Sequence, residues 1–441
     1  LEAQANGPSD KLGYSANLSI KGVTAQAPRL KAKPRIDGVI RVATDRIESI
    51  ALAMKAPGNE LSLRGKVLGI TSAKPRADLE ISSSGMDLDQ LVDWPPPAPK
   101  KGASLGVKNA WAGPAPEETA DYDALVAPLR ASAPARAFVA NAGFNLKTVK
   151  AYGVVLSGIQ GKMALDQLVA ALTGFEFRLW DGIFKAGMKI DLKPAKPTYQ
   201  FDTSVRGLDL KQAVSSQLQL FKNTILGKAD FQITGKGTSF NPPAAKAALD
   251  AQGSLSVTDA TFATVDVSKM ATESINQSLQ KVGDKIPALR GKKLGGGLSK
   301  ESRYERISSS FTISGGKFRA PDFYAKAMEK QGIDLKGNTT VGLIDLSLKA
   351  DWEIIDTYNL TRAADLEDGI LLEKGKPFRV PVSAGCNVMD PCYSYTQAPE
   401  FLAKVAATNF AKSAVLKQVE SKAPPALRKS IKGLGKKLFG R

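Results

Sequence analysis

Histidine is absent from the 441-residue sequence, and several kinds of site are excluded with it. Ser-His-Asp and Cys-His catalysis need that residue, as do His-rich zinc sites and the usual general base near neutral pH. The acidic residues offer no replacement, because Asp and Glu are scattered at alternating positions typical of solvated strand faces, not of calcium or two-metal sites. We therefore expect a protein that is not an enzyme and that uses neither a metal ion nor a cofactor.

A phosphate-binding loop is also missing. Residues 290–303 (RGKKLGGGLSKESR) are rich in glycine and lysine but lack the G-x-x-x-x-G-K-[ST] spacing, so a mobile basic loop is favoured over an anion site. Residues 235–239 (GKGTS) are typical of a strand end followed by a turn.

Cysteine is scarce, since only Cys386 and Cys392 occur. They flank Asp390-Pro391, which favours a turn, so the two side chains can close a small loop. A disulfide here would contribute about 2–3 kcal/mol at most, and it would persist only in an oxidising compartment such as the bacterial periplasm. We favour this bridge over the alternative of two unpaired buried thiols.

Long apolar runs are lacking as well. No segment approaches the roughly 20 apolar residues that span a bilayer, and the first 22 residues contain no apolar region of a signal peptide. Because the chain opens with Leu1 rather than Met, we expect a fragment or a processed product whose targeting segment is missing.

Charge is unbalanced, with 61 basic and 43 acidic residues giving a formal net charge of +18. Such an excess favours anionic partners, either nucleic acid or a membrane surface rich in acidic lipid. The aromatic-and-basic signatures of single-strand binding folds are absent, and no segment resembles a major-groove helix. We therefore expect a membrane surface as the partner and not nucleic acid.

Alternating polar and apolar residues, broken by turn residues, fill 11–85 and resume from 138 to about 355. The long helical spacers of parallel sheets are missing, so the pattern predicts an antiparallel β-meander. Residues 94–137 are rich in Pro and Ala and suit either a linker or a long ordered loop. The predicted domains are an N-terminal β layer (1–93), the linker (94–137), a β region with two amphipathic helices (138–380), and a cysteine loop with C-terminal basic helices (381–441).

Residues 172–194 (LTGFEFRLWDGIFKAGMKIDLKP) have the pattern of a hairpin. Phe175, Phe177 and Leu179 alternate with charged residues. Residues 180–182 (WDG) supply the turn, because glycine tolerates the positive φ that tight turns require. The return strand places on one face Ala186, Met188, Ile190 and Leu192.

Helical spacing marks residues 208–225 and 267–286. The chain then ends in two further predicted helices, 398–422 and 426–441, separated by Pro424-Pro425. The apolar stripes are Leu210, Ala213, Val214, Leu218 and Phe221 in the first helix, and Met270, Ile275, Leu279 and Val282 in the second.

The sequence also repeats itself. Residues 70–92 align without gaps on residues 192–214, so that Ala73-Lys74-Pro75 falls on Ala195-Lys196-Pro197. One module, a strand followed by a helix, therefore occurs twice, which indicates a stacked, repeat-like architecture.

Several of these stretches resemble the C-terminal region of AsmA-family proteins: VLSGIQGKMALDQLVAALTGFEFRLWDGIFKAGMKIDLKP, YQFDTSVRGLDLKQAV and LGKADFQITGKGTSF. The resemblance covers residues 138–350 well and residues 11–93 more loosely. It implies a periplasmic protein of the bacterial envelope, held in the inner membrane by one N-terminal helix and linked to outer-membrane biogenesis. Relatives among bridge-like lipid-transfer proteins imply a long curved antiparallel sheet that forms an open, taco-like groove for acyl chains. The N-terminal helix is absent here, and the cysteine loop is not a family hallmark.

Periodicity alone does not say what the apolar strand face contacts. A closed sandwich core and a sheet curled around lipid tails both need one dry face, and the repeat favours a continuous trough. With the resemblance, we predict these lipid-groove residues: Phe175, Phe177, Leu179, Met188, Ile190, Phe231, Ile233, Leu255, Val257, Phe311, Ile313, Leu346, Leu348 and Trp352.

The last predicted helix combines apolar residues at helical spacing with a basic remainder. It can lie on an anionic membrane surface, gaining about 1 kcal/mol per cation, or pack against the sheet end with its lysines in water. The basic residues are Arg428, Lys429, Lys432, Lys436 and Lys437.

The leading hypothesis is a periplasmic protein, mainly β with peripheral helices, that binds or conducts phospholipid or another envelope lipid and supports outer-membrane biogenesis. The rival is an envelope assembly factor or scaffold that binds protein partners through edge strands and basic patches. Binding of an anionic envelope polymer is a third option, which rests only on the charge.

Overall fold

The structure is a computed structural model of the chain. It describes residues 2–6, 13–26, 29–94, 121–217, 225–262, 267–284, 287–295, 302–363, 371–372, 376–387, 390–394 and 397–422. The described part of the chain is mainly β with few helices, and the sheet is curved, mostly antiparallel and open. The predicted class, mainly β with peripheral helices, is therefore confirmed.

The chain divides into two compact units. The first unit comprises Leu1–Leu220 and Asp230–Gly253, and the second comprises Phe221–Ala229 and Ser254–Arg441. Two strands, β12 (Ile225–Thr238) and β13 (Asp250–Phe262), have residues in both units. The boundary thus falls within strands, where the composition of the chain gives no sign of it.

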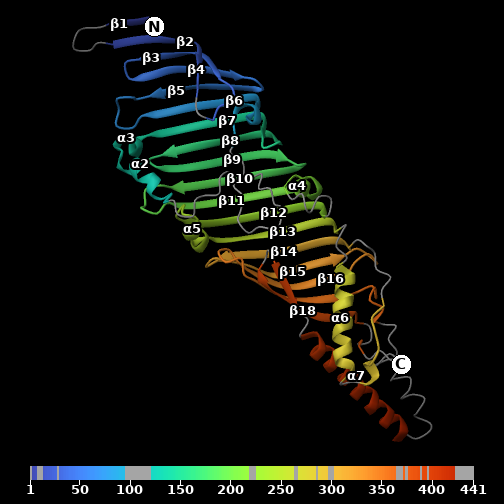
Figure 1. Ribbon diagram of the computed structural model, residues 1–441. Helices are drawn as coiled ribbons and strands as arrows, with labels where there is room; N and C mark the ends of the chain where they lie inside the picture. Colours follow the sequence, from blue (N-terminus) through green and yellow to red (C-terminus); the bar gives the residue numbers. More distant parts are fainter. Residues whose placement is uncertain are drawn as a thin grey trace. The chain divides into compact units, whose positions relative to one another are not determined.

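Consecutive strands of the first unit pair with one another (Figure 1). The pairs are antiparallel except β6 with β7, which are parallel because the chain returns after β6 to the edge where β6 began. A parallel crossover needs a dozen or more residues, and the segment between Asp87 and Val139 supplies them. The strands are β1 (Glu2–Asn6), β2 (Gly13–Thr24), β3 (Arg35–Ala43), β4 (Arg46–Ala56), β5 (Asn59–Leu68), β6 (Arg76–Asp87), β7 (Val139–Ala151), β8 (Val154–Asp166), β9 (Val169–Leu179), β10 (Gly182–Asp191) and β11 (Thr198–Asp209).

Strand register separates two faces in the first unit, because directly opposed residues point to the same side of a sheet. One unbroken row of register partners, here called the apolar row, crosses β2 to β11: Leu18, Ile40, Ile50, Gly65, Leu79, Ala142, Met163, Leu172, Met188 and Phe201. A second row, the polar row, crosses β3 to β11: Asp37, Ala53, Ser62, Ser82, Asn145, Gln160, Glu176, Lys185 and Ser204. The faces that carry these rows are called the apolar face and the polar face below.

The predicted hairpin of residues 172–194 is formed by β9 and β10. Phe177 opposes Phe184 and Phe175 opposes Ala186, so the faces are those that the alternation predicts. The expected role of Gly182 is wrong, since the positive φ angles belong to Trp180 (49°) and Asp181 (61°). Gly182 instead allows close packing, because a Cβ there would lie 3.1 Å from the Leu179 carbonyl oxygen.

The sequence repeat is a repeat of structure. Strand β6 leads into α1 (Leu88–Leu91), and β11 leads into α4 (Leu210–Gln217). In each copy an aspartate caps the helix: Asp87 accepts from the Gln90 amide at 3.2 Å, and Asp209 accepts from the Gln212 amide at 3.0 Å. Such caps satisfy amides that lack a partner within the helix.

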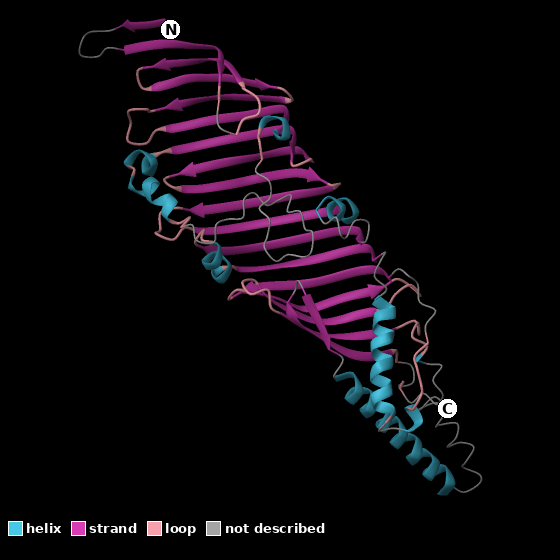
Figure 2. Ribbon diagram, in the orientation of Figure 1, coloured by secondary structure: helices cyan, strands magenta, loops and turns pink. Residues whose placement is uncertain are grey.

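The remaining helices of the first unit are short and continue from strand ends, along the edges of the sheet (Figure 2). They are η1 (Ala124–Val126), α2 (Ala127–Ala131) and α3 (Ala133–Ala137) before β7, and α5 (Pro242–Ala248) after β12. Helices η1, α2 and α3 lie within residues 94–137, for which a linker or a long ordered loop was predicted, and α5 was not predicted.

The second unit combines antiparallel strands with two long helices. The strands are β14 (Ser302–Ser314), β15 (Lys317–Ala327), β16 (Asp334–Gly342), β17 (Leu348–Asp356), β18 (Phe378–Asn387) and β19 (Asp390–Ser394). Helices α6 (Val267–Gly283) and α7 (Gln397–Lys422) confirm two predicted helices. A buried cluster joins both helices to β18, with Ile275, Leu279, Val380 and Leu402 each 0% exposed. The second unit therefore has a closed hydrophobic core.

A 3-10 turn, η3 (Pro287–Leu289), follows α6, and the side chain of Asn276 holds the segment after it. Asn276 donates to the Leu294 carbonyl at 3.0 Å and accepts from the Leu294 amide at 2.6 Å. The first part of the predicted basic loop is thus bound to α6, and residues 296–301 lie outside the described part of the chain.

Candidate functional site: the apolar face of the first unit

A cluster of phenylalanines occupies the middle of the apolar face. The rings of Phe144 and Phe175 have centroids 5.9 Å apart, and those of Phe175 and Phe177 are 5.5 Å apart. Phe177 stacks on Phe184 with centroids 4.6 Å apart and planes inclined by 10°. The rings come from β7, β9 and β10, so cross-strand contact holds them side by side.

Side chains on this face lie against one another but are only partly buried. In the apolar row, Met163 is 49% exposed, Met188 is 43% exposed and Leu18 is 39% exposed. Phe144, Phe175, Phe177 and Phe184 are all half-buried. Because the described helices of this unit continue from strand ends, they do not form a second layer over the face. A face this apolar and this accessible is typical of a binding surface.

The equivalent side chains of the second unit are buried. Phe311, Ile313, Ile354 and Val380 are 4%, 8%, 3% and 0% exposed. Buried side chains of α6 and α7 pack against Phe378 and Val380 of β18. The predicted groove residues therefore fall into two environments, one accessible and one occupied by the protein itself.

Five predicted groove residues lie on the hairpin of the first unit. On the apolar face Met188 is exposed, and the other three, Phe175, Phe177 and Ile190, are half-buried. Leu179 is buried at the strand end. Two more, Phe231 and Ile233, are half-buried on β12. On β13, Leu255 is 37% exposed and Val257 is 9% exposed.

The remaining predictions fall in the second unit, and one of them is wrong. Leu346 lies outside β17, in a turn with a φ of 56°, where Asp345 accepts a hydrogen bond from the Ser347 amide at 3.1 Å. Leu348 is half-buried opposite Val341. Trp352 packs against the cluster of Ile333, Ile354 and Val382, and its indole N–H donates to Thr339 Oγ1 at 3.1 Å.

The sequence prediction omitted several side chains of the same face. Phe184 opposes Phe177, Phe201 opposes Met188, and Tyr199 opposes Ile190. Phe184 is two residues before Ala186, so the same alternation could have found it. Phe144 required the register of β7 with its neighbours, which the sequence does not state.

The polar face carries charged pairs and shallow hollows. Lys185 and Glu176 pair across strands at 3.1 Å, and Arg35 pairs with Asp37 at 2.9 Å. The hydrogen bond from Arg35 lowers the pKa of Asp37. The larger hollow, about 500 Å³, is lined by Glu80, Gly143, Phe144, Asn145, Gln160, Gly161, Lys162, Thr173 and Gly174.

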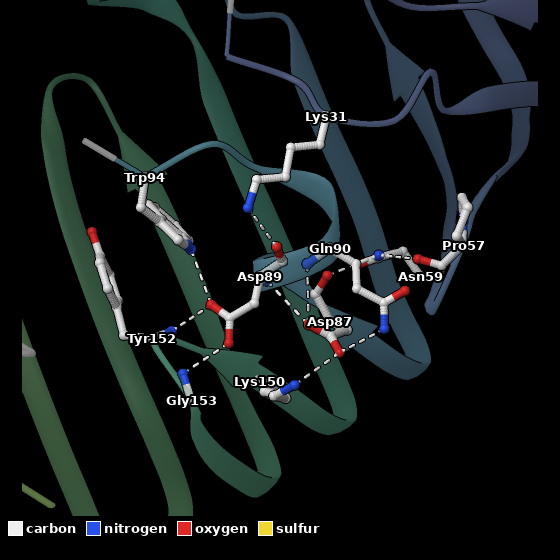
Figure 3. A network of polar contacts seen from close by, with 10 residues as sticks. All are labelled: Lys31, Pro57, Asn59, Asp87, Asp89, Gln90, Trp94, Lys150, Tyr152 and Gly153. Carbon is white, nitrogen blue, oxygen red and sulfur yellow. Dashed lines mark hydrogen bonds and ion pairs between the residues drawn. The ribbon is translucent and has the colours of Figure 1, made fainter. Parts of the chain in front are cut away.

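A polar network fixes the end of β6 to the turn between β7 and β8 (Figure 3). The half-buried Asp89 carboxylate accepts from the amides of Tyr152 at 2.6 Å and Gly153 at 2.8 Å, and from the Trp94 indole at 3.0 Å. Burial alone would raise the pKa of Asp89, but these donors outweigh it, so the pKa is lowered. Trp94 also stacks on Tyr152 with centroids 4.4 Å apart. These contacts tie α1 and Trp94 to the turn between β7 and β8.

Cys386 and Cys392 form the predicted disulfide between β18 and β19, with Cα atoms 5.6 Å apart. Among the described residues, no three His, Cys, Asp or Glu side chains could hold a metal ion, and no helix there is long and apolar enough to cross a membrane. The second half of the first predicted helix and the basic residues at 428–437 lie outside the described part of the chain.

Comparison with family models, with curated proteins and with solved structures gives no match to this chain. The AsmA resemblance stays a prediction from the sequence.

Proposed function

We propose that the apolar face of the first unit binds the acyl chains of a phospholipid or another envelope lipid. The supporting observation is the apolar row, which runs through ten consecutive strands without a polar side chain and is partly exposed. An enzyme is not proposed, since the apolar row offers only hydrocarbon, one aromatic ring and thioethers. Its role would be to replace membrane interior around a lipid tail.

The dimensions and energies suit this role. Strands lie about 4.8 Å apart, so the row from β2 to β11 extends about 45 Å, compared with about 30 Å for the whole hydrocarbon core of a bilayer. Burial of a chain of about 15 methylenes at about 0.8 kcal/mol each gives an upper limit of about 12 kcal/mol. Because the surface repeats from strand to strand, a tail can shift between similar positions without leaving hydrocarbon.

The disulfide and the resemblance point to where the protein acts. A disulfide persists in oxidising compartments, which fits the periplasm. From the resemblance we propose that the protein is held at the inner membrane and supports outer-membrane biogenesis by binding or conducting lipid. The covered face of the second unit would not take part in binding along β18.

Native mass spectrometry of the purified chain tests the proposal. Lipid-sized adducts that are lost on extraction with organic solvent would support it. A chain that carries no lipid after purification, and takes none from phosphatidylethanolamine and phosphatidylglycerol vesicles, would refute it. A stoichiometric protein partner in place of lipid would favour the scaffold function.

A further inference from the structure

Glycines on the apolar face of the first unit lie where no larger residue fits. A Cβ at Gly65 would lie 2.5 Å from the Asp78 carbonyl oxygen and 2.7 Å from Leu79 Cδ2. A Cβ at Gly161 would lie 2.6 Å from Phe144 Cζ. These distances are shorter than real Cβ contacts, so each glycine makes room for its cross-strand neighbour.

The same arrangement recurs along the face. A Cβ at Gly38 would lie 2.7 Å from Leu52 Cδ2, and one at Gly235 would lie 2.8 Å from Phe201 Cζ. At Gly237 the obstacle is the ring of Tyr199, with Cζ 2.5 Å away. In every case a large side chain of the neighbouring strand occupies the space next to the glycine. None of these five glycines has positive φ, so space and not backbone conformation explains them.

The polar face differs. Gly143 lies on the polar face, opposite Lys162, and a Cβ there would meet nothing within 4 Å. A Cβ at Gly187, also on this face, would lie 2.4 Å from Asp202 Oδ1, which is the end of a side chain that can move. At Gly38 and Gly65, by contrast, the obstacle includes backbone of the adjacent strand. The space over the polar-face glycines is thus open or closed by a movable side-chain end, whereas backbone closes the space over Gly38 and Gly65, as expected for a sheet that bends toward its apolar face.

We infer that these five glycines bend the first unit toward its apolar face and limit how far side chains project from it. The face then forms a shallow trough for linear acyl chains. This inference rests on the proposed function and specifies its ligand class. Large side chains that fill the space next to glycines leave a surface of low relief, which a flexible chain can follow. A rigid fused-ring lipid needs a concave pocket, which such a surface lacks.

The test compares Gly161→Ala with Gly143→Ala, two changes in paired strands on opposite faces. Binding of the linear fluorescent fatty acid cis-parinaric acid to delipidated full chain is measured by titration. We expect Gly161→Ala to weaken binding on the order of tenfold, because the methyl group forces Phe144 upward or the strands apart. Gly143→Ala should bind within about twofold of the unchanged chain.

The double variant Gly161→Ala with Phe144→Ala should bind no more weakly than Phe144→Ala alone, since removal of the ring makes room for the methyl group. If Gly161→Ala does not fold, Gly65→Ala with and without Leu79→Ala repeats the design. Normal binding by Gly161→Ala, while Phe177→Asp abolishes binding, would overturn the inference and leave the proposed function standing. Failure of the unchanged chain to bind would overturn both. Displacement of the fatty acid by dehydroergosterol as readily as by palmitate would overturn the ligand class.

Discussion

Phe177 and Phe184 stack face to face across the β9–β10 hairpin, with centroids 4.6 Å apart, and both remain half-buried. Aromatic pairs of this kind usually lie inside a core, where a second layer covers them. Here the strands themselves supply the contact, and the outer side of the pair stays accessible. The first unit thus places hydrophobic side chains on an accessible surface. A lipid ligand that binds there would explain this placement.

The exposure of this pair predicts a modest cost for its removal. In delipidated protein, Phe177→Ala should lower the free energy of unfolding by less than about 2 kcal/mol, because the ring already meets solvent. Leu279→Ala, in the fully buried cluster of α6, should cost about 2–5 kcal/mol. Urea unfolding followed by circular dichroism measures both. Equal costs would mean that Phe177 is covered as fully as Leu279.

The Asp89 network predicts a loss of order at acid pH. The folded pKa of Asp89 is lowered, so its stabilising effect is fully present above the unfolded value of about 3.9 and is lost as pH falls through the lower folded pKa. Protonation removes an acceptor for Tyr152, Gly153 and Trp94. Trp94 fluorescence, measured in a chain whose other tryptophans are replaced by phenylalanine, should therefore change below pH 4.

The control for this prediction is Asp89→Asn, which cannot ionise. The variant should be less stable than the unchanged chain at pH 7, and its stability should depend less on pH below pH 4. A pH profile identical to that of the unchanged chain would show that another group governs the acid transition.

The disulfide predicts a small contribution to stability that is lost under reducing conditions. Cys386→Ser with Cys392→Ser should lower the free energy of unfolding of the second unit by about 2 kcal/mol, because the closed loop is short. When the unchanged chain is unfolded chemically in the presence of dithiothreitol, its free energy of unfolding should fall by the same amount. The double variant should not respond to the reductant, and any response would place the redox effect elsewhere.

The sequence predicted the elements of this chain better than their environment. Alternation located the hairpin of residues 172–194 and the shared face of Leu348 and Trp352, and helical spacing located α6. Alternation states only that one strand face is dry. It does not distinguish Phe177, which solvent reaches, from Phe311, which protein covers.

Contacts between segments distant in the sequence determine whether such an apolar side chain is exposed or covered. Helices α6 and α7 pack on β18 although other segments separate them from it in the sequence. No local sequence pattern predicts this contact. The parallel pairing of β6 with β7 could not be predicted from local patterns either, because it depends on where the chain returns to the sheet after residue 93. Leu346 was misplaced because the alternation continues through a turn that Asp345 and Ser347 stabilise.

The most direct test of acyl-chain binding is lipid copurification with matched charge substitutions on the two faces of β9. Phe177→Asp places a carboxylate on the apolar face, and Arg178→Asp places one on the polar face at the next residue. Lipid extracted per mole of folded chain is measured by mass spectrometry. We predict that Phe177→Asp abolishes bound lipid while Arg178→Asp retains the level of the unchanged chain. Retention of lipid by a folded Phe177→Asp chain would contradict the account.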